Sequence, residues 1–194
     1  MSMDTWVVVG LGNPGPAYAS HRHNVGQMVL DELAERAGGR FKAASGQRAL
    51  LVEGRLTMGG PKVVLVKPTT YMNRSGGPVS GLAKYFRVAP HHVIAVHDEV
   101  DLAFDEVKLR KGGSENGHNG LRDMTKALGT RDYLRVRVGV GRPPGRQDTA
   151  DYVLSNFSSQ ERKLLPFVTG AASDAVESIV ADGFDAALAR VNGS

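Results

Sequence analysis

The chain has 194 residues, 41% of them hydrophobic, and it contains no cysteine. This length is enough to bury a sizeable core in one domain, and the lack of cysteine excludes disulfides, thiol catalysis and cysteine metal sites. We find no run of about 18 apolar residues, so no membrane-spanning segment is expected. The first strand is predicted so early that no signal peptide is expected either, which favours a cytoplasmic protein.

The formal net charge of +4 is unevenly distributed. Residues 105–146 carry ten basic and five acidic side chains, whereas residues 147–194 carry three basic and seven acidic ones. A modest excess is commonly ordinary surface charge. A basic middle segment beside an acidic tail nevertheless indicates a face that meets a polyanion.

The first predicted element is a strand at residues 6–9, whose Trp-Val-Val-Val sequence is typical of a strand buried on both faces. It ends in a loop rich in glycine and proline that contains Asn13. Asn24 then has the position of a helix N-cap, with Gln27 at the spacing of a capping box, and a pair of glycines ends this helix. His23 therefore precedes the positive end of a helix, where a neutral imidazole is favoured.

The same loop also fits the dinucleotide fingerprint G-x-G-x-x-G, through Gly10, Gly12 and Gly15. In that motif the helix begins within the glycines, so that its N-terminus meets a pyrophosphate. Here Pro14 and Pro16 remove amide donors, and the helix begins about eight residues later than the fingerprint requires. Dinucleotide binding is therefore the weaker interpretation of this loop.

The following segments alternate between strand and helix patterns up to residue 140. Strands separated by helices predict an α/β fold, a single three-layer domain over residues 1–194 with a mixed central β-sheet surrounded by helices. The later predicted strands are 47–53, 62–66, 93–96, 106–111 and 133–140, and the predicted helices between them end near residues 86 and 128.

The remainder of the chain is predicted to be helical. Ser158 and Glu161 have the spacing of a capping box. Pro166 is expected to separate a short turn from a longer helix that ends near Asp182, because proline removes a helical hydrogen bond. A last short helix is predicted at residues 184–191.

Several polar side chains fall just beyond the ends of predicted strands, where sites assemble in α/β sheets. Taken singly, these residues have structural explanations: Asn13 as a turn residue, Asp98 as a loop carboxylate, and two others, Asn73 and Asn119, as N-caps. Together they place histidine, carboxylate and carboxamide groups at equivalent positions of the architecture. They are Asn13 with His23, Asn73, Asp98, and His118 with Asn119.

The residue inventory narrows the chemistry of such a site. No serine lies in a G-x-S-x-G motif, so covalent nucleophilic catalysis lacks a candidate. No H-E-x-x-H spacing occurs, and His91-His92 is interpreted as a surface pair, so no metal is expected. A His–Asp pair that activates water remains, with carboxamides that hold a carbonyl group. This combination predicts hydrolysis of an activated acyl bond without a cofactor.

Four segments, in this order and spacing, closely resemble the bacterial peptidyl-tRNA hydrolase family, and two later segments look similar to it. The resemblance runs over nearly the whole chain. It implies an enzyme that hydrolyses the ester between peptide and tRNA, which recycles tRNA from prematurely released chains and supports translation. It also implies a monomer that binds the acceptor arm of tRNA. The segments are GLGNPGPAYASHRHNVG, KPTTYMNRSGG, VHDEVDL and GHNGLRD, followed by RVRVGVGRPPGR and DYVLSNF.

The resemblance assigns roles to particular residues. His23 matches the catalytic histidine of the family, and Asp98 matches the carboxylate that partners it. The carboxamides that bind the peptide and position water would be Asn13, Asn73 and Asn119. The peptide groove would be lined by Tyr18, Met72 and His118, and a looser alignment places Lys108, Arg110 and Arg137 at the contact with tRNA.

Two positions depart from the family pattern. His21 stands where threonine is usual, two residues from the proposed catalytic histidine. Glu115 lies in the loop of residues 112–117, which contains less glycine than many family versions, so the mobility of this loop is in question. A non-catalytic RNA-binding protein on the same scaffold is the rival interpretation, since fold alone does not fix activity. The presence of His23, Asp98 and Asn13 together argues against it.

Overall fold

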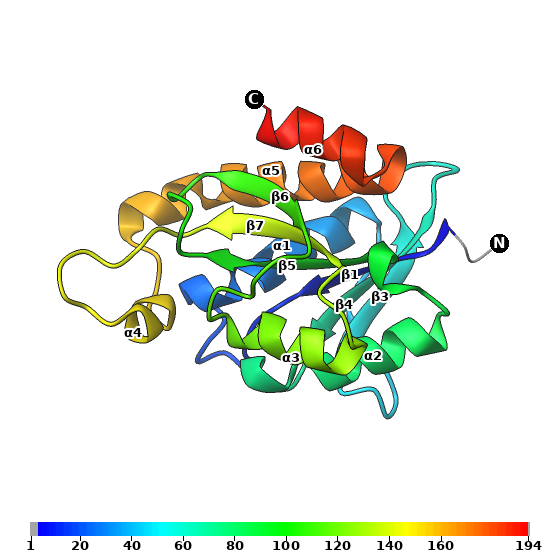
Figure 1. Ribbon diagram of the computed structural model, residues 1–194, viewed down its shortest axis with the longest axis horizontal. Coiled ribbons are helices and arrows are strands. Elements are labelled where there is room, and N and C mark those ends of the chain that lie inside the picture. Colours follow the sequence, from blue (N-terminus) through cyan, green and yellow to red (C-terminus); the bar gives the residue numbers. More distant parts are fainter. Residues whose placement is uncertain (1–3, 194) are drawn as a thin grey trace.

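The computed structural model describes residues 4–193 and places every strand of that part in one seven-stranded sheet (Figure 1). The strand order is β2-β3-β4-β1-β5-β7-β6. Strands β4, β1, β5 and β7 run parallel, and the remaining strands join as antiparallel neighbours, so the predicted mixed sheet is confirmed. The strands are β1 (Trp6–Gly10), β2 (Lys42–Ala43), β3 (Ala49–Arg55), β4 (Lys62–Pro68), β5 (Val93–Glu99), β6 (Val107–Lys111) and β7 (Leu134–Gly139).

The central strands are continuous apolar runs because both faces of the sheet are covered. Val8 of β1 lies between Leu65 of β4 and Ile94 of β5, and all three side chains are fully buried. Val8 packs into the core on one face of the sheet, whereas its neighbours Val7 and Val9 pack into a second core on the other. Alternate residues of one strand thus hold two layers of helices.

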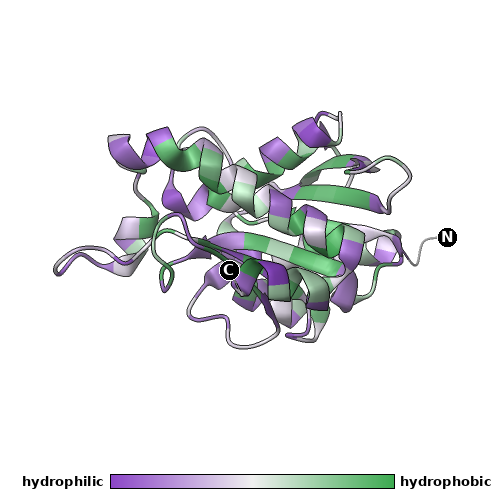
Figure 2. Cartoon of the chain, turned by 90° about the horizontal axis from the view of Figure 1, so that it is seen from above, coloured by the Kyte–Doolittle hydropathy of each residue, from purple (hydrophilic) through white to green (hydrophobic). Residues whose placement is uncertain are grey.

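Helices cover the two faces of the sheet. Figure 1 shows α5 and α6 above the sheet and α2 and α3 below it. Figure 2, seen from above, shows that α5 and α6 carry both purple and green turns, as amphipathic helices do. The first face is covered by α1 (Val25–Arg36), α5 (Ser159–Asp182) and α6 (Phe184–Asn192), and the second by α2 (Gly76–Tyr85) and α3 (Asn119–Leu128). The short α4 (Thr149–Val153) lies beyond the end of the sheet, and 3-10 turns occur at Arg22–Asn24, Met72–Arg74 and Pro90–His92.

The prediction that Pro166 divides the C-terminal helix is wrong. Helix α5 runs without interruption through Pro166, starting from the predicted capping box of Ser158 and Glu161. A proline removes only one backbone donor, and beyond it the helix is held by a buried apolar face that includes Val176 and Ile179. Two short elements, β2 and α4, were not predicted because segments of two and five residues carry no hydrophobic period.

Helix α5 is long and apolar enough to cross a membrane by length and composition, which the sequence analysis did not recognise. Core helices of soluble proteins meet the same two conditions. Here α5 packs against α1 and α6, and its buried apolar side chains, which include Val176 and Ile179, belong to the core between this helix and the sheet. Its composition is therefore explained by packing inside the protein.

The first turn of α1 lies directly against the carboxyl end of β5, and this contact depends on a glycine. A Cβ atom on Gly26 would lie 2.2 Å from the carbonyl oxygen of Val96 and 3.0 Å from the backbone of Leu11. No real side chain fits at that distance. Gly26 therefore allows α1 to start beside the end of β5, the edge of the sheet where the loops after β1 and β5 meet.

We expect Gly26→Ala to destabilise the protein by about 3 kcal/mol or more, because its methyl group forces the helix away from a backbone carbonyl. Gly170→Ala is the matched control within a helix, since the nearest atom to its Cβ would be a carboxylate oxygen of Glu32 at 3.8 Å. That change should be neutral or stabilise by up to about 1 kcal/mol. Chemical denaturation of both variants measures the difference, and equal effects would contradict the close contact.

Candidate active site

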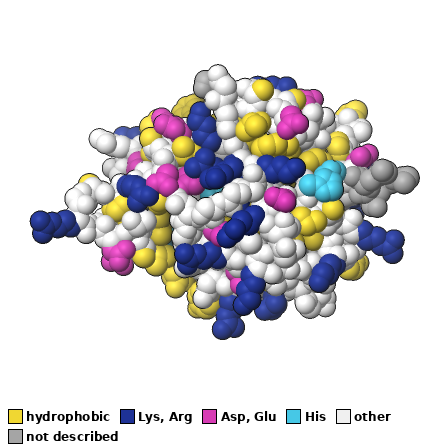
Figure 3. All heavy atoms as spheres, viewed as in Figure 1, with side chains coloured by type: hydrophobic (Ala, Val, Ile, Leu, Met, Phe, Trp, Pro, Cys, Tyr) yellow, Lys and Arg dark blue, Asp and Glu magenta, His cyan; other side chains and the backbone are white. Residues whose placement is uncertain are grey.

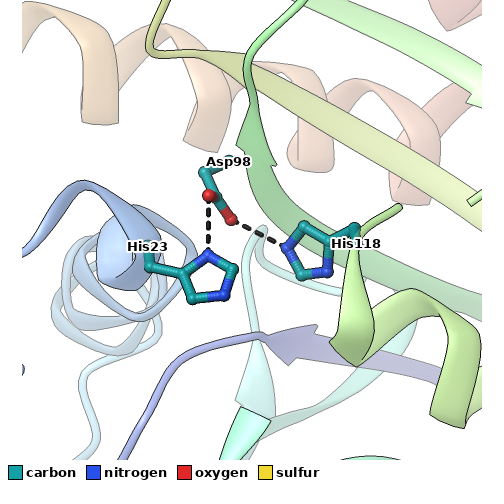
Figure 4. A group of neighbouring side chains, drawn as sticks. All are labelled: His23, Asp98 and His118. Carbon is teal, nitrogen blue, oxygen red and sulfur yellow. Dashed lines mark hydrogen bonds and ion pairs between the residues drawn. The ribbon is translucent and has the colours of Figure 1, made fainter. Parts of the chain in front are cut away.

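Asp98, near the end of β5, binds two histidines from distant parts of the chain (Figure 4). Its Oδ2 lies 2.7 Å from Nδ1 of His23, and its Oδ1 lies 2.8 Å from Nε2 of His118. His23 comes from the turn before α1, and His118 immediately precedes α3. All three side chains are largely buried, with 2% of Asp98 exposed, so both contacts lie out of bulk solvent.

The backbone of α3 determines which nitrogen of His118 carries a proton. Nδ1 of His118 accepts hydrogen bonds from the backbone N–H groups of Gly120 and Leu121, at 3.1 and 3.3 Å. A ring nitrogen that accepts has no proton, so the proton of the neutral ring is on Nε2 and is donated to Asp98. His118 is thus the N-cap of α3, a role that the sequence analysis had considered for Asn119. Both of its ring nitrogens are occupied inside the protein.

Asp98 also controls the ionisation of His23. Burial lowers the pKa of His23, but the negative charge of Asp98 and its hydrogen bond raise it, and the pKa ends above the ordinary 6.5. This is the opposite of what the helix N-terminus alone predicts. Burial would raise the pKa of Asp98, but its histidine neighbours hold it far below the usual range. The carboxylate therefore stays ionised and the transferable proton belongs to His23.

His97 lies beside this group but cannot carry charge at neutral pH. Its ring is 2% exposed, its Nδ1 donates to the backbone carbonyl of Asp98 at 2.8 Å, and its Nε2 is buried without a partner among the described residues. Burial, and to a smaller extent the neighbouring His118, lowers the pKa of His97 to about 3. His97 is therefore a neutral part of the cavity lining, which the sequence analysis did not identify.

The loop after β1 is held by Asn24. Its carboxamide accepts from the backbone N–H of Asn13 at 3.0 Å and donates to the carbonyl of Asn13 at 2.8 Å. The predicted capping box is wrong, because this long-range pair occupies the Asn24 side chain and Gln27 reaches the carbonyl of Pro68 instead. The glycines of the loop serve packing: a Cβ on Gly10 would lie 2.7 Å from the carbonyl of Gly26. No helix begins among them, as the dinucleotide interpretation would need.

With its backbone held by Asn24, Asn13 has its side chain fixed in one orientation by a further hydrogen bond. Oδ1 of Asn13 accepts from the backbone N–H of Met72 at 2.7 Å. Its Nδ2 makes no hydrogen bond to the residues that the structure describes, so this donor is free to bind a ligand. The structure thus turns Asn13 into a hydrogen-bond donor, suited to a carbonyl oxygen or an oxyanion.

These side chains open into a cavity of about 980 Å³. Asn73 and Asn119 are exposed at its sides and hydrogen-bond no other described residue through their side chains. Another part of the cavity lining was not predicted from the sequence. It includes Val153, the last residue of α4, and Leu154, which follows it. Of the residues predicted for the site, the structure brings seven to this cavity: Asn13, His23, Met72, Asn73, Asp98, His118 and Asn119.

Tyr18 does not line the cavity. Its ring contacts Tyr71, which does, at 6.2 Å between ring centroids, and it also contacts His21 at 5.6 Å. His21 therefore packs beside Tyr18 and forms a backbone bridge to Asn156, away from the cavity. The second imidazole near His23 is no part of the group around Asp98.

The three residues aligned with tRNA contacts have different surroundings. Nζ of Lys108 lies 3.5 Å from the carbonyl of Asn192, and Arg137 pairs with Glu99 at 3.0 Å. Arg110 is exposed and has no ion pair among the described residues. The first two are thus engaged inside the protein, whereas Arg110 is free for a partner.

The loop of residues 112–118 borders the cavity, and hydrogen bonds to neighbouring residues hold it in place. Arg135 donates to the carbonyls of Gly113 and Ser114, at 3.0 and 2.6 Å. Glu115 is 8% exposed and accepts hydrogen bonds from Arg131 and Thr125, at 2.8 and 2.9 Å. The departure at Glu115 thus adds an anchor to this loop.

His23, Asp98 and His118 also have the composition of a metal site, with ligand atoms within 4.8 Å of one another. A metal at Nε2 of His118 would require the proton to move to Nδ1. There it would face the N–H groups of Gly120 and Leu121, which need an acceptor. The hydrogen bonds around His118 therefore oppose metal binding.

Comparisons with known proteins give one consistent result. The family model described as peptidyl-tRNA hydrolase matches residues 7–194. The chain is 65% identical over 184 residues to the peptidyl-tRNA hydrolase of Paenarthrobacter aurescens, covering 95% of this chain and 94% of that one. It is 52% identical over 190 residues to that of Streptomyces avermitilis, covering 96% and 93%. The crystal structure of the Acinetobacter baumannii peptidyl-tRNA hydrolase superposes with a TM-score of 0.89 at 33% identity, covering 98% and 95%.

Replacing His118 with asparagine should raise the pKa of His23. Asparagine preserves the N-cap of α3 but is too short to donate to Asp98. With one hydrogen bond fewer, the carboxylate stabilises the protonated ring of His23 more strongly. We expect a rise of about one pH unit in an NMR titration of the His23 ring. His21→Asn is the matched control and should leave that pKa unchanged. An unchanged His23 pKa in His118→Asn would contradict the sharing of Asp98.

Proposed function

Because the chain belongs to the peptidyl-tRNA hydrolase family and acts as a hydrolase on peptidyl-tRNA, we propose that His23 activates the water that cleaves the ester. The ester joins the peptide to the ribose of tRNA, so cleavage recycles tRNA from prematurely released chains. The observation that carries this proposal is the 2.7 Å contact between Asp98 and Nδ1 of His23, inside the cavity. It leaves the opposite nitrogen, Nε2, without a partner among the described residues and available to water.

The mechanism is general acid–base catalysis without a covalent intermediate. Nε2 of His23 takes a proton from water as the oxygen of that water attacks the ester carbonyl. Asp98 keeps the proton on Nδ1 and stabilises the imidazolium that forms. When the tetrahedral intermediate collapses, His23 returns the proton to the departing ribose oxygen. Both products leave and His23 is again neutral.

The carboxamides would bind the peptide and the developing oxyanion. Hydrogen bonds to Asn24 and Met72 fix the orientation of Asn13, so its Nδ2 is a better candidate for the oxyanion donor than the other two carboxamides. Asn73 and Asn119 lie on the exposed sides of the cavity, where they would bind backbone groups of the peptide. Met72 would contribute an apolar surface, and Tyr18 would support the groove only through Tyr71.

Basic side chains would hold the phosphates of the acceptor arm. Figure 3 shows lysine and arginine side chains spread across the middle of the face on which β6 and α3 lie in Figure 1. Phosphate contacts are independent of sequence, which suits an enzyme that acts on many tRNAs. Arg110 has no ion pair among residues 4–193, whereas Lys108 and Arg137 would have to leave their partners to reach a phosphate.

The remaining expectations are parts of the same proposal. One sheet carries all strands of the described residues, which supports a single domain over residues 1–194. A monomer needs no residue from a second chain, and the group around Asp98 draws all its partners from this one. The peptidyl-tRNA substrate is made by ribosomes, which supports a cytoplasmic location. The hydrogen bonds of His118 favour chemistry without a metal at this group.

Loss of the His–Asp pair should abolish most activity while the fold remains. We expect His23→Ala to lower kcat by about 10²–10⁴, the usual contribution of general-base catalysis, and Asp98→Asn to cause a loss of similar size. Only neutral His23 accepts a proton, and its pKa is raised. The rate should therefore increase with pH along a titration curve whose midpoint lies above pH 6.5. Release of peptide from purified peptidyl-tRNA measures both effects. A fully active His23→Ala, with His91→Ala as the control, would contradict the role of His23. Wild-type protein that releases no peptide would favour the non-catalytic RNA-binding interpretation.

The basic residues should differ in their effect on substrate binding. We expect Arg110→Ala to raise KM and to reduce the slope of log KM against log salt by about 0.9, with kcat nearly unchanged. Lys108→Ala should change KM less, because its amine is already directed at the carbonyl of Asn192. Kinetics between about 50 and 200 mM salt test this difference. Equal effects of the two variants would contradict it.

A further inference from the structure

Arg22, the residue before His23, is a buried cation whose partners all lie in one distant segment. It is 7% exposed. Its Nη1 donates to Oγ of Ser155 at 2.6 Å, and its Nη2 pairs with Oε1 of Glu161 at 2.9 Å. The guanidinium carbon lies 4.0 Å from the centre of the Tyr152 ring, as in a cation–π contact. Residues 152–161 thus surround the guanidinium.

The backbone of the same turn is attached to the same segment. The N–H of Arg22 donates to the carbonyl of Ser155 at 3.0 Å, and His21 forms an antiparallel bridge with Asn156. Main chain and side chain therefore connect the turn that carries His23 to the segment between α4 and α5. Movement of one part must move the other or break these bonds.

The carboxylate of Glu161 connects this contact to the start of α5. Oε1 of Glu161 accepts from the backbone N–H of Ser158 at 2.8 Å, closing the capping box, and from Arg22 at 2.9 Å. One oxygen thus holds the guanidinium and the first turn of the long helix. Since α5 packs on the core, it provides a rigid support for this connection.

The segment between these anchors has little stability of its own. Helix α4 has five residues, and Val153 is its one buried residue. Helices this short are marginal unless tertiary contacts hold them. Yet Thr149, Ala150 and Val153 of α4, with Leu154 after it, form one side of the cavity. The position of this side relative to His23 therefore depends on contacts such as those of Arg22.

We propose that Arg22 is a positioning residue that fixes the α4 side of the cavity at its working distance from His23. This rests on the proposed function, because the cavity is the site in which His23 would act. Arg22 itself touches no reacting atom. Through Glu161 and Ser155 it holds the apolar surface of Val153 and Leu154 in place, against which part of the peptidyl-tRNA would bind. Loosening that surface should weaken substrate binding more than it slows the chemical step.

The variants Arg22→Lys and Glu161→Gln test this proposal from the two ends of the ion pair. Lysine retains the positive charge but lacks the two Nη groups with which the guanidinium binds Ser155 and Glu161 at the same time. Glutamine preserves the capping box but removes the ion pair. Arg36→Lys is the matched control, because Arg36 of α1 also pairs with another element, through Asp174 and Glu177 of α5, but with no partner in residues 149–161.

Two readouts separate positioning from stability alone: amide hydrogen exchange of residues 149–156, and kinetics with peptidyl-tRNA. We expect Arg22→Lys and Glu161→Gln to speed exchange there about tenfold or more and to raise KM by a similar factor, with a smaller fall in kcat. Arg36→Lys should lower Tm yet change neither readout. Exchange and KM that match those of Arg36→Lys would overturn the proposal. If exchange speeds up but wild-type protein cleaves no peptidyl-tRNA, the proposed function fails while the link to α4 stands.

Discussion

The ionised carboxylate of Asp98, bound on both oxygens by imidazole rings, is the interaction on which the site depends. It lies near the end of a fully buried strand, where an unpaired charge would be very costly. His23 and His118 satisfy it at 2.7 and 2.8 Å, and each contact fixes a ring in one orientation. The same buried charge that needs these two hydrogen bonds thus prepares His23 to act as a base.

The scaffold brings these groups together by close backbone packing. Gly26 lets α1 begin against the carbonyl of Val96, one turn after His23 and beside the strand that carries Asp98. The carboxamide of Asn24 closes the loop after β1 and thereby aims Asn13 into the cavity. Each of these contacts joins the carboxyl end of a strand to the start of a helix, so the rigid sheet sets the distances in the site.

The sequence predicts the features that depend on local pattern. Runs such as residues 6–9 and 93–96 identify buried strands, and the helix that starts at the capping box of Ser158 and Glu161 is found at the right place. The resemblance to the family locates His23 and Asp98, which lie 75 residues apart. Asn24 does stand at the N-cap position of α1, but its side chain does not cap the helix as expected, because nothing in its neighbourhood shows that the backbone 11 residues earlier binds that side chain. The capping of α3 by His118 was missed for a related reason, since histidine is an unusual N-cap and Asn119 beside it is a common one.

The most direct test of this account is the position of the protons on His118 and His23. Long-range ¹⁵N–¹H correlation spectra of the histidine rings, recorded above the pKa of His23, distinguish the two neutral tautomers of each ring. We predict that His118 carries its proton on Nε2, with Nδ1 accepting from α3, and that His23 carries its proton on Nδ1, with Nε2 free. A proton on Nδ1 of His118, or on Nε2 of neutral His23, would contradict the account.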